Sequence, residues 1–127
     1  MDFDDSRRAI YIQISDRICD AIMRGDYDAD GRLPSVRDYA AEAEVNANTV
    51  MRSYDRLAAD GLIYNRRGIG FFVAPEARLK IIRRRTDELI NTRMPSLFDL
   101  MMHLGISPQA LAEAYQSYID NHQTPAK

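Results

Sequence analysis

Apolar residues recur every four positions near the start of the chain and predict a first helix over residues 9–24. The stripe consists of Ile10, Ile14, Ile18 and Ile22. Gly25 follows directly, and glycine readily adopts the left-handed conformation that ends a helix. Residues 26–34 are rich in turn formers and predict a loop.

Two further helices are predicted from the residues that would cap them. Ser35 is followed three residues later by Asp38, a pair that resembles a capping box and starts a helix to about residue 43. Asn46 is a good N-cap for a second helix, which reaches about Asp60. The inward face of this second helix is Val50, Tyr54, Leu57 and Ala58.

The remainder of the chain predicts one hairpin and three more helices. Residues 62–74 hold two short runs of Ile, Tyr, Phe and Val around two arginines and two glycines, which indicates a β-hairpin. A helix over 76–92 would carry Leu79, Ile82, Leu89 and Ile90 on one side. Ser96 is expected to cap a short helix that ends at Gly105, and Ser107 with Pro108 starts the last one. The chain is therefore mainly α with a small β-hairpin.

Composition limits the classes of function. The chain has 127 residues, 46% of them apolar, which is enough for one compact domain or for a small domain with an appendage. It has no run of about 18 apolar residues. The acidic N-terminus is no signal peptide, and Cys19 is the single cysteine, so we expect a cytoplasmic protein. No phosphate-binding glycine loop, metal cluster or Ser/His/Asp set occurs, and His103 and His122 stand apart. We expect no enzyme, no cofactor, no metal and no membrane.

The charge is unevenly placed. The net charge is −2, which argues weakly against nucleic-acid binding, but residues 1–30 carry −4 and the two following parts, 31–73 and 74–127, each carry +1. All cations except Lys80 and Lys127 are arginine, whose planar fork of donors suits phosphates and guanine edges.

Two helices joined by a short turn have the helix-turn-helix shape, in which the second helix enters the major groove. Asn48 and Arg52 would face outward, roughly 200° from the buried face at 100° per residue, and both suit base edges. Asn46 and Thr49 lie in the first turn, where free backbone N–H groups could meet phosphate. The hairpin loop adds a basic wing for the minor groove, with supporting residues from the preceding segment. The wing candidates are Arg66, Arg67 and Gly68, and the supporting candidates are Arg32, Ser35 and Arg37.

Each signal alone has an ordinary explanation. Many helix pairs look like a helix-turn-helix, and an exposed arginine pair is often a solvated turn, so the ordered combination carries the argument. A winged-helix module that binds protein or RNA is the alternative, and strong salt dependence on duplex DNA would separate the two.

An ordered set of segments resembles the GntR family of bacterial regulators. The segments are IYIQI at 10–14, GRLPSVRDYA at 31–40, VNANTVMRSY at 45–54, Leu57, DGLI at 60–63 and GIGFFV at 68–73. The resemblance implies a winged helix-turn-helix, a dimer on a palindromic operator, and DNA contacts at Arg37, the start of the recognition helix and Gly68. Many members have arginine where this chain has Ala47 and Met51, so no operator sequence is carried over. Base recognition is then expected to rely on Asn46, Asn48, Thr49 and Arg52.

The C-terminal part resembles the YtrA-like subfamily, whose tail is a small helical dimerisation unit. We therefore expect a DNA-binding domain over 1–75, a dimerisation tail over 76–127, and a homodimeric repressor. Three short helices are too little to enclose a typical metabolite, so a small-molecule effector is not expected. Met94, Met101 and Met102 are expected to fill an interface or core. For Arg83, Arg84 and Arg85 a solvated face is favoured over phosphate contacts or ion pairs with a partner.

Overall fold

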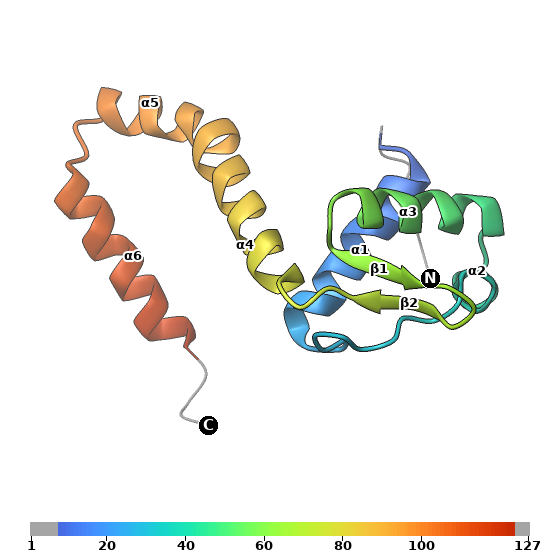
Figure 1. Ribbon diagram of the computed structural model, residues 1–127. Coiled ribbons are helices and arrows are strands. Elements are labelled where there is room, and N and C mark those ends of the chain that lie inside the picture. Colours follow the sequence, from blue (N-terminus) through green and yellow to red (C-terminus); the bar gives the residue numbers. More distant parts are fainter. Residues whose placement is uncertain (1–7, 124–127) are drawn as a thin grey trace. The chain divides into compact units, whose positions relative to one another are not determined.

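The computed structural model describes residues 8–123, and the chain forms two compact units. The first unit ends at Arg85 and the second begins at Thr86. Figure 1 shows helices and a β-hairpin in the first unit and a succession of helices in the second. Within the described residues, no helix is both long enough and apolar enough to cross a bilayer.

Three helices of the first unit follow the predicted pattern. They are α1 (Ile10–Arg24), α2 (Val36–Ala43) and α3 (Ala47–Ala59). Gly25 ends α1 with a φ of 89°, the left-handed conformation that glycine adopts without steric cost. The Ser35 side chain accepts a hydrogen bond from the N–H of Asp38 at 3.0 Å, and Asn46 accepts one from the N–H of Asn48 at 2.7 Å. Both predicted N-caps are confirmed.

The predicted hairpin is present and has a third, short partner. Strands β1 (Ile63–Arg66) and β2 (Gly70–Val73) are antiparallel, with Ile63 opposite Val73 and Arg66 opposite Gly70. The loop before α2 runs along the other edge of β2, where the Leu33 N–H donates to the Phe71 carbonyl at 2.9 Å. The sequence predicted this segment only as a loop. Its pairing fixes the chain before the helix-turn-helix against the hairpin.

The core of the first unit lies between α1, α3 and the hairpin. Its fully buried side chains include Ile14, Val50, Tyr54, Leu57 and Leu62. Tyr54 meets Tyr39 and Phe71 edge-on and donates its hydroxyl proton to the Pro34 carbonyl at 2.7 Å. The inward face predicted for α3 is therefore confirmed, and the one polar group of Tyr54 is satisfied.

Helix α4 (Ala77–Glu88) begins in the first unit, and the residues that it buries differ from the predicted stripe. Ala77 and Ile81 belong to the core, whereas Leu79 is 56% exposed. The Ala77 N–H donates to the carbonyl of Ala74, the buried residue that follows β2. Because the chain turns directly from the hairpin into the helix, the position of Ala77 decides which face meets the core.

The second unit contains the end of α4, a π-helical turn η1 (Leu89–Arg93), α5 (Pro95–His103) and α6 (Pro108–His122). The regular helix expected to residue 92 widens at η1, where the Met94 N–H donates to the Leu89 carbonyl at 2.8 Å. The expected Ser96 cap is wrong: α5 starts at Pro95 after Met94, whose backbone is already helical, so no break is left to cap. Ser107 is confirmed as the cap of α6, accepting from the Ala110 N–H at 3.0 Å.

The second unit has no buried side chain among its described residues, and Met94, Phe98, Met101, Leu111 and Ile119 are only half-buried. Large apolar side chains are exposed along it, as the predicted stripes suggested. They are Leu89, Ile90, Leu97, Leu100, Met102, Leu104, Ile106, Tyr115 and Tyr118.

Candidate nucleic-acid interface

Helix α3 presents two of the predicted readers to solvent. Val50 and Tyr54 are fully buried, and Asn48 and Arg52 are exposed on the other side of the helix. Residues four apart share one face of a helix, so the two side chains lie one turn from each other. An amide and a guanidinium on one helical turn can address adenine and guanine edges in the major groove.

In the first turn of α3, more hydrogen-bonding groups are already bonded within the chain than the sequence suggested. The Asn46 side chain accepts from the Asn48 N–H, and the Thr49 N–H donates to the Asn46 carbonyl at 3.0 Å. Two of the N–H groups expected to meet phosphate are thus hydrogen-bonded within the chain. Asn46 also cannot offer its amide oxygen to adenine while it caps the helix. Thr49 is half-buried, which leaves Asn48 as the better placed base reader of the three.

Arg52 lies against a residue that the sequence reasoning did not associate with DNA. Its guanidinium carbon is 4.0 Å from the centre of the Tyr11 ring on α1. Ser53, the next residue along α3, is fully buried, and its hydroxyl donates a hydrogen bond to the Tyr11 carbonyl at 2.7 Å. This bond joins α3 to α1 at the same place. The two partners are about forty residues apart, so no local pattern could have revealed the contact.

The wing is an exposed basic loop. Arg66 and Arg67 are exposed, and the Arg66 guanidinium lies 5.6 Å from the centre of the Phe72 ring. Gly68 has a φ of 77° and open space around it, so a side chain there would be disfavoured by the backbone conformation and not by a neighbour. A loop with this composition can approach a phosphate backbone closely.

Arg32 holds the wing from the side. One of its terminal nitrogens donates to the Ile69 carbonyl at 2.6 Å. A Cβ added at Gly70 would lie 3.2 Å from the Arg32 Nε, so the glycine makes room for this guanidinium. Arg37 and Ser35 are exposed at the start of α2, where the Ser35 oxygen serves as the helix cap. Arg32 is therefore a brace for the wing as well as a surface cation.

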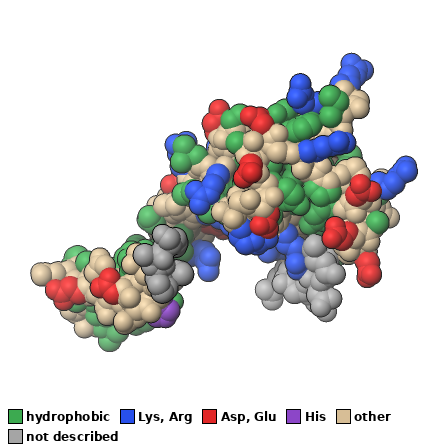
Figure 2. Space-filling view, turned by 90° about the horizontal axis from the view of Figure 1, so that it is seen from below, with side chains coloured by type: hydrophobic (Ala, Val, Ile, Leu, Met, Phe, Trp, Pro, Cys, Tyr) green, Lys and Arg blue, Asp and Glu red, His purple; other side chains and the backbone are tan. Residues whose placement is uncertain are grey.

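The charges of the first unit fall into two groups. Ion pairs join Arg8 to Asp16, Arg24 to Asp26, Arg84 to Asp60 and Arg85 to Asp20. Within residues 8–123, none of the five arginines selected from the sequence (32, 37, 52, 66 and 67) forms an ion pair. Figure 2 shows basic side chains projecting from the surface of this unit. Cations without a carboxylate partner are available to replace counterions on a phosphate backbone.

The arginine run at the end of the first unit has a different role. Arg84 reaches Asp60 at 3.3 Å, and Arg85 reaches Asp20 at 2.8 Å. Arg85 also donates to the Asp16 carbonyl at 3.4 Å. These two side chains fasten α4 to α1 and to the end of α3 instead of forming a wholly solvated face.

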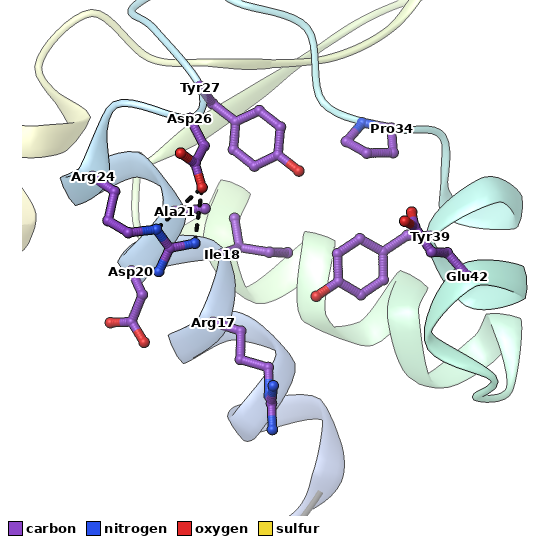
Figure 3. Close-up of a pocket in the computed structure, with 10 residues that line it drawn as sticks. All are labelled: Arg17, Ile18, Asp20, Ala21, Arg24, Asp26, Tyr27, Pro34, Tyr39 and Glu42. Atoms are coloured by element: carbon purple, nitrogen blue, oxygen red, sulfur yellow. Dashed lines mark hydrogen bonds and ion pairs between the residues drawn. The ribbon is translucent and has the colours of Figure 1, made fainter. Parts of the chain in front are cut away.

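A pocket of about 330 Å³ lies between α1, the following loop and α2 (Figure 3). Tyr27 and Tyr39 project into it, and its charged lining includes the Arg24–Asp26 pair and Glu42. Arg37 lies on another face of α2, because it is roughly 200° from Tyr39 around the helix axis. The pocket therefore gathers none of the residues selected for DNA contact.

Cys19 is buried in the core beside this region. Loss of solvent around the thiol raises its pKa from 9.0 to about 11, and the nearby Arg85 offsets only part of that effect. The thiol is consequently neutral at physiological pH and is packed as a small apolar group.

Comparison with known proteins decides the family. The family model described as bacterial regulatory proteins, gntR family, matches residues 10–73, which span α1 to the end of β2. The chain belongs to the GntR family. The resemblance carried by the sequence motifs is thus confirmed.

The likeness of this GntR protein extends beyond the first unit. A crystal structure of a putative GntR regulator from Bacteroides thetaiotaomicron is 46% identical, with a TM-score of 0.78, over 91% of this chain and all of that one. The HTH-type transcriptional regulator YhcF of Bacillus subtilis is 30% identical over 91% of this chain and 93% of its own length. The transcriptional repressor YtrA of Bacillus subtilis is 27% identical over 85% of this chain and 82% of its own length.

Family membership settles the general activity. The chain is a transcriptional regulator with a DNA-binding helix-turn-helix, and it is not an enzyme. Within that framework, α2 and α3 form the helix-turn-helix, α3 is the recognition helix, and β1 and β2 form the wing.

Proposed function

We propose that this protein is a homodimeric repressor that binds a palindromic operator through two copies of its helix-turn-helix. Asn48 and Arg52 would contact base edges in the major groove, and Arg66, Arg67 and Gly68 would lie at the minor groove. Arg37 would contact phosphates through its guanidinium, Asn46 through its amide nitrogen and Thr49 through its hydroxyl, and Arg32 and Ser35 would support the wing and α2. Such a regulator would act in the cytoplasm and needs no cofactor.

The observation that carries this proposal is the state of the selected arginines. All five lie in the region from the segment before α2 to the wing, are exposed, and lack an ion pair within the described residues. Arg8, Arg24, Arg84 and Arg85 of the same unit are paired with aspartates, whereas Arg56, Arg78 and Arg83 also lack an ion pair within the described residues. The gathering of five such cations between the segment before α2 and the wing therefore carries the argument. An uncompensated cluster of arginines costs self-repulsion, which an anionic partner relieves.

The homodimer is supported by the exposed apolar side chains of the second unit. Leu100, Met102 and Leu104 are 54%, 76% and 67% exposed. Short helices with such faces gain stability by packing against another copy. We propose that residues 76–127 are the dimerisation tail and that 1–75 hold the DNA-binding part, although Ala77 and Ile81 lend side chains to its core.

The first test measures DNA binding by fluorescence anisotropy. A duplex selected by the protein from a random library, and a scrambled duplex, would be titrated at several salt concentrations. We expect preference for the selected duplex, and a slope of log affinity against log salt that Arg67→Ala reduces by about 1. Arg93→Ala, which removes the same charge from the second unit, is the control. Binding without salt dependence, or no binding at low salt, would favour a protein- or RNA-interaction module.

The second test measures self-association by sedimentation equilibrium. Leu100→Asp would place a charge in the proposed interface, and we expect the dimer dissociation constant to rise at least about 100-fold. Ile10→Asp, at an exposed apolar position of the first unit, should leave the dimer intact. Affinity for a duplex with two half-sites should fall with Leu100→Asp, and affinity for a single half-site should not. A Leu100→Asp variant that remains a dimer would contradict the assignment of the tail.

A further inference from the structure

Tyr11 and Arg52 form a contact between α1 and the exposed face of α3. The guanidinium carbon of Arg52 is 4.0 Å from the ring centre, a distance at which a cation and an aromatic face attract each other. The Tyr11 carbonyl accepts a hydrogen bond from Ser53, the residue after Arg52, at 2.7 Å. The ring and the guanidinium are therefore carried by two helices that are joined at this point.

We propose that Tyr11 is a positioning residue for base recognition, which holds the guanidinium of Arg52 in one orientation on the surface of α3. This inference rests on the proposed role of Arg52 as a base reader. Tyr11 itself does not touch the base. Its ring sets the direction in which the donors of Arg52 point.

The contact leaves the donors of Arg52 available. The five N–H groups of a guanidinium lie in its plane, and the attraction between a cation and the aromatic face beneath its central carbon needs no conventional hydrogen bond from them. Within residues 8–123, the side chain of Arg52 has no hydrogen bond or ion pair. A carboxylate in place of Tyr11 would neutralise the charge and occupy the same N–H groups that guanine O6 and N7 require.

Positioning has a physical benefit for a long side chain. A free arginine samples many rotamers, and ordering it on binding costs free energy that a preorganised side chain has already lost. Tyr11 is only half-buried and is not among the core residues, so the core does not require its ring. The looser contact of Arg66 with Phe72, at 5.6 Å, shows that an arginine beside a ring in this unit is not always packed so closely.

The test uses the full chain and the duplex that it selects from a random library. Anisotropy would be measured on that duplex and on a set in which each base pair is substituted in turn. Arg52→Ala identifies the base pair at which discrimination, about 5- to 150-fold, is lost. We expect Tyr11→Leu to lower discrimination at that same base pair at least about threefold and to leave the others unchanged.

Three further variants make the expectation specific to the ring. Tyr11→Phe keeps the aromatic face and should retain discrimination. Tyr11→Leu combined with Arg52→Ala should be no worse than Arg52→Ala alone. Tyr27→Leu, the same substitution at another half-buried tyrosine of this unit, should change nothing at that base pair.

A spectroscopic measurement applies even if Tyr11→Leu does not fold. In the wild-type protein and in Tyr11→Phe, the ring current should shift the side-chain protons of Arg52 upfield in the NMR spectrum. Unshifted protons would overturn the inference, as would full discrimination by folded Tyr11→Leu or an Arg52→Ala variant that loses no discrimination. Failure of the proposed function is a different result, since the wild-type protein itself would then select no duplex.

Discussion

The two units of this regulator use similar apolar helices in opposite ways. The first unit buries its large side chains, with Ile14, Leu57 and Leu62 at most 1% exposed. The second unit leaves Leu100 and Leu104 more than half exposed and buries no described side chain. An amphipathic helix therefore does not reveal whether its apolar face serves its own chain or another. The first unit encloses an apolar core of its own. The apolar side chains of the second unit remain in contact with water within a single chain.

The largest expected difference concerns leucine truncation. Leu57→Ala should lower the free energy of unfolding by about 2–5 kcal/mol, because it leaves a cavity in a closed core. Leu100→Ala should lower it by less than about 1 kcal/mol, since little of that side chain is removed from water within one chain. Urea denaturation at concentrations where the protein is monomeric measures both. Equal losses would mean that the second unit has a core of its own.

A second difference should appear at alkaline pH. The Cys19 thiol ionises at about 9 when unfolded and at about 11 when buried, so its contribution is complete below pH 9 and is lost as pH rises to 11. The full loss should be roughly 3 kcal/mol, at 1.36 kcal/mol for each of the two pKa units, and about 2 kcal/mol of it should be reached by pH 11. Denaturation of the wild-type protein and of Cys19→Ala at pH 8 and pH 11 tests this. Parallel curves for the two proteins would contradict it.

Two helix caps of equal geometry provide a finer comparison. Ser35 and Ser107 each accept a backbone N–H at 3.0 Å, at the starts of α2 and α6. Ser35→Ala should cost about 1 kcal/mol in global unfolding, because α2 unfolds with the core. Ser107→Ala should instead speed hydrogen exchange in α6 and leave the first unit unchanged. The comparison fails if exchange in α1 and α3 responds to Ser107→Ala.

The smallest expected effect is that of the ion pair between Arg84 and Asp60. The two side chains are 50% and 34% exposed, and a pair in contact with solvent contributes about 0.5 kcal/mol or less. A double-mutant cycle with Arg84→Gln and Asp60→Asn measures the coupling. Ile81→Ala, by contrast, should cost about 2–4 kcal/mol because Ile81 is buried in the core. A coupling energy above the about 2–4 kcal/mol expected for Ile81→Ala would mean that the ion pair, and not the burial of Ile81, is the main attachment of α4.

The proposed DNA surface was only partly accessible to sequence reasoning. The outward direction of Asn48 and Arg52 follows from helical periodicity, and the exposed glycine loop follows from composition. Because the Asn46 side chain caps the N-terminus of α3, Asn48 and not Asn46 is the asparagine placed to read a base, and this depends on side-chain geometry. The hydrogen bond from Arg32 to Ile69 and the contact of Arg52 with the Tyr11 ring join residues about forty positions apart.

The sequence by itself determined the local elements: the helices of the first unit, their caps at Ser35 and Asn46, and the hairpin around Gly68. These depend on hydrogen bonds and conformations within a few residues, which composition and spacing report directly. The tertiary structure alone decided that α4 buries Ala77 and Ile81, that the chain enters α5 through a π-helical turn, and that Arg84 and Arg85 pair with aspartates of the first unit. Those outcomes depend on which surfaces meet in space, and helical periodicity allows several faces to be buried until a partner surface selects one.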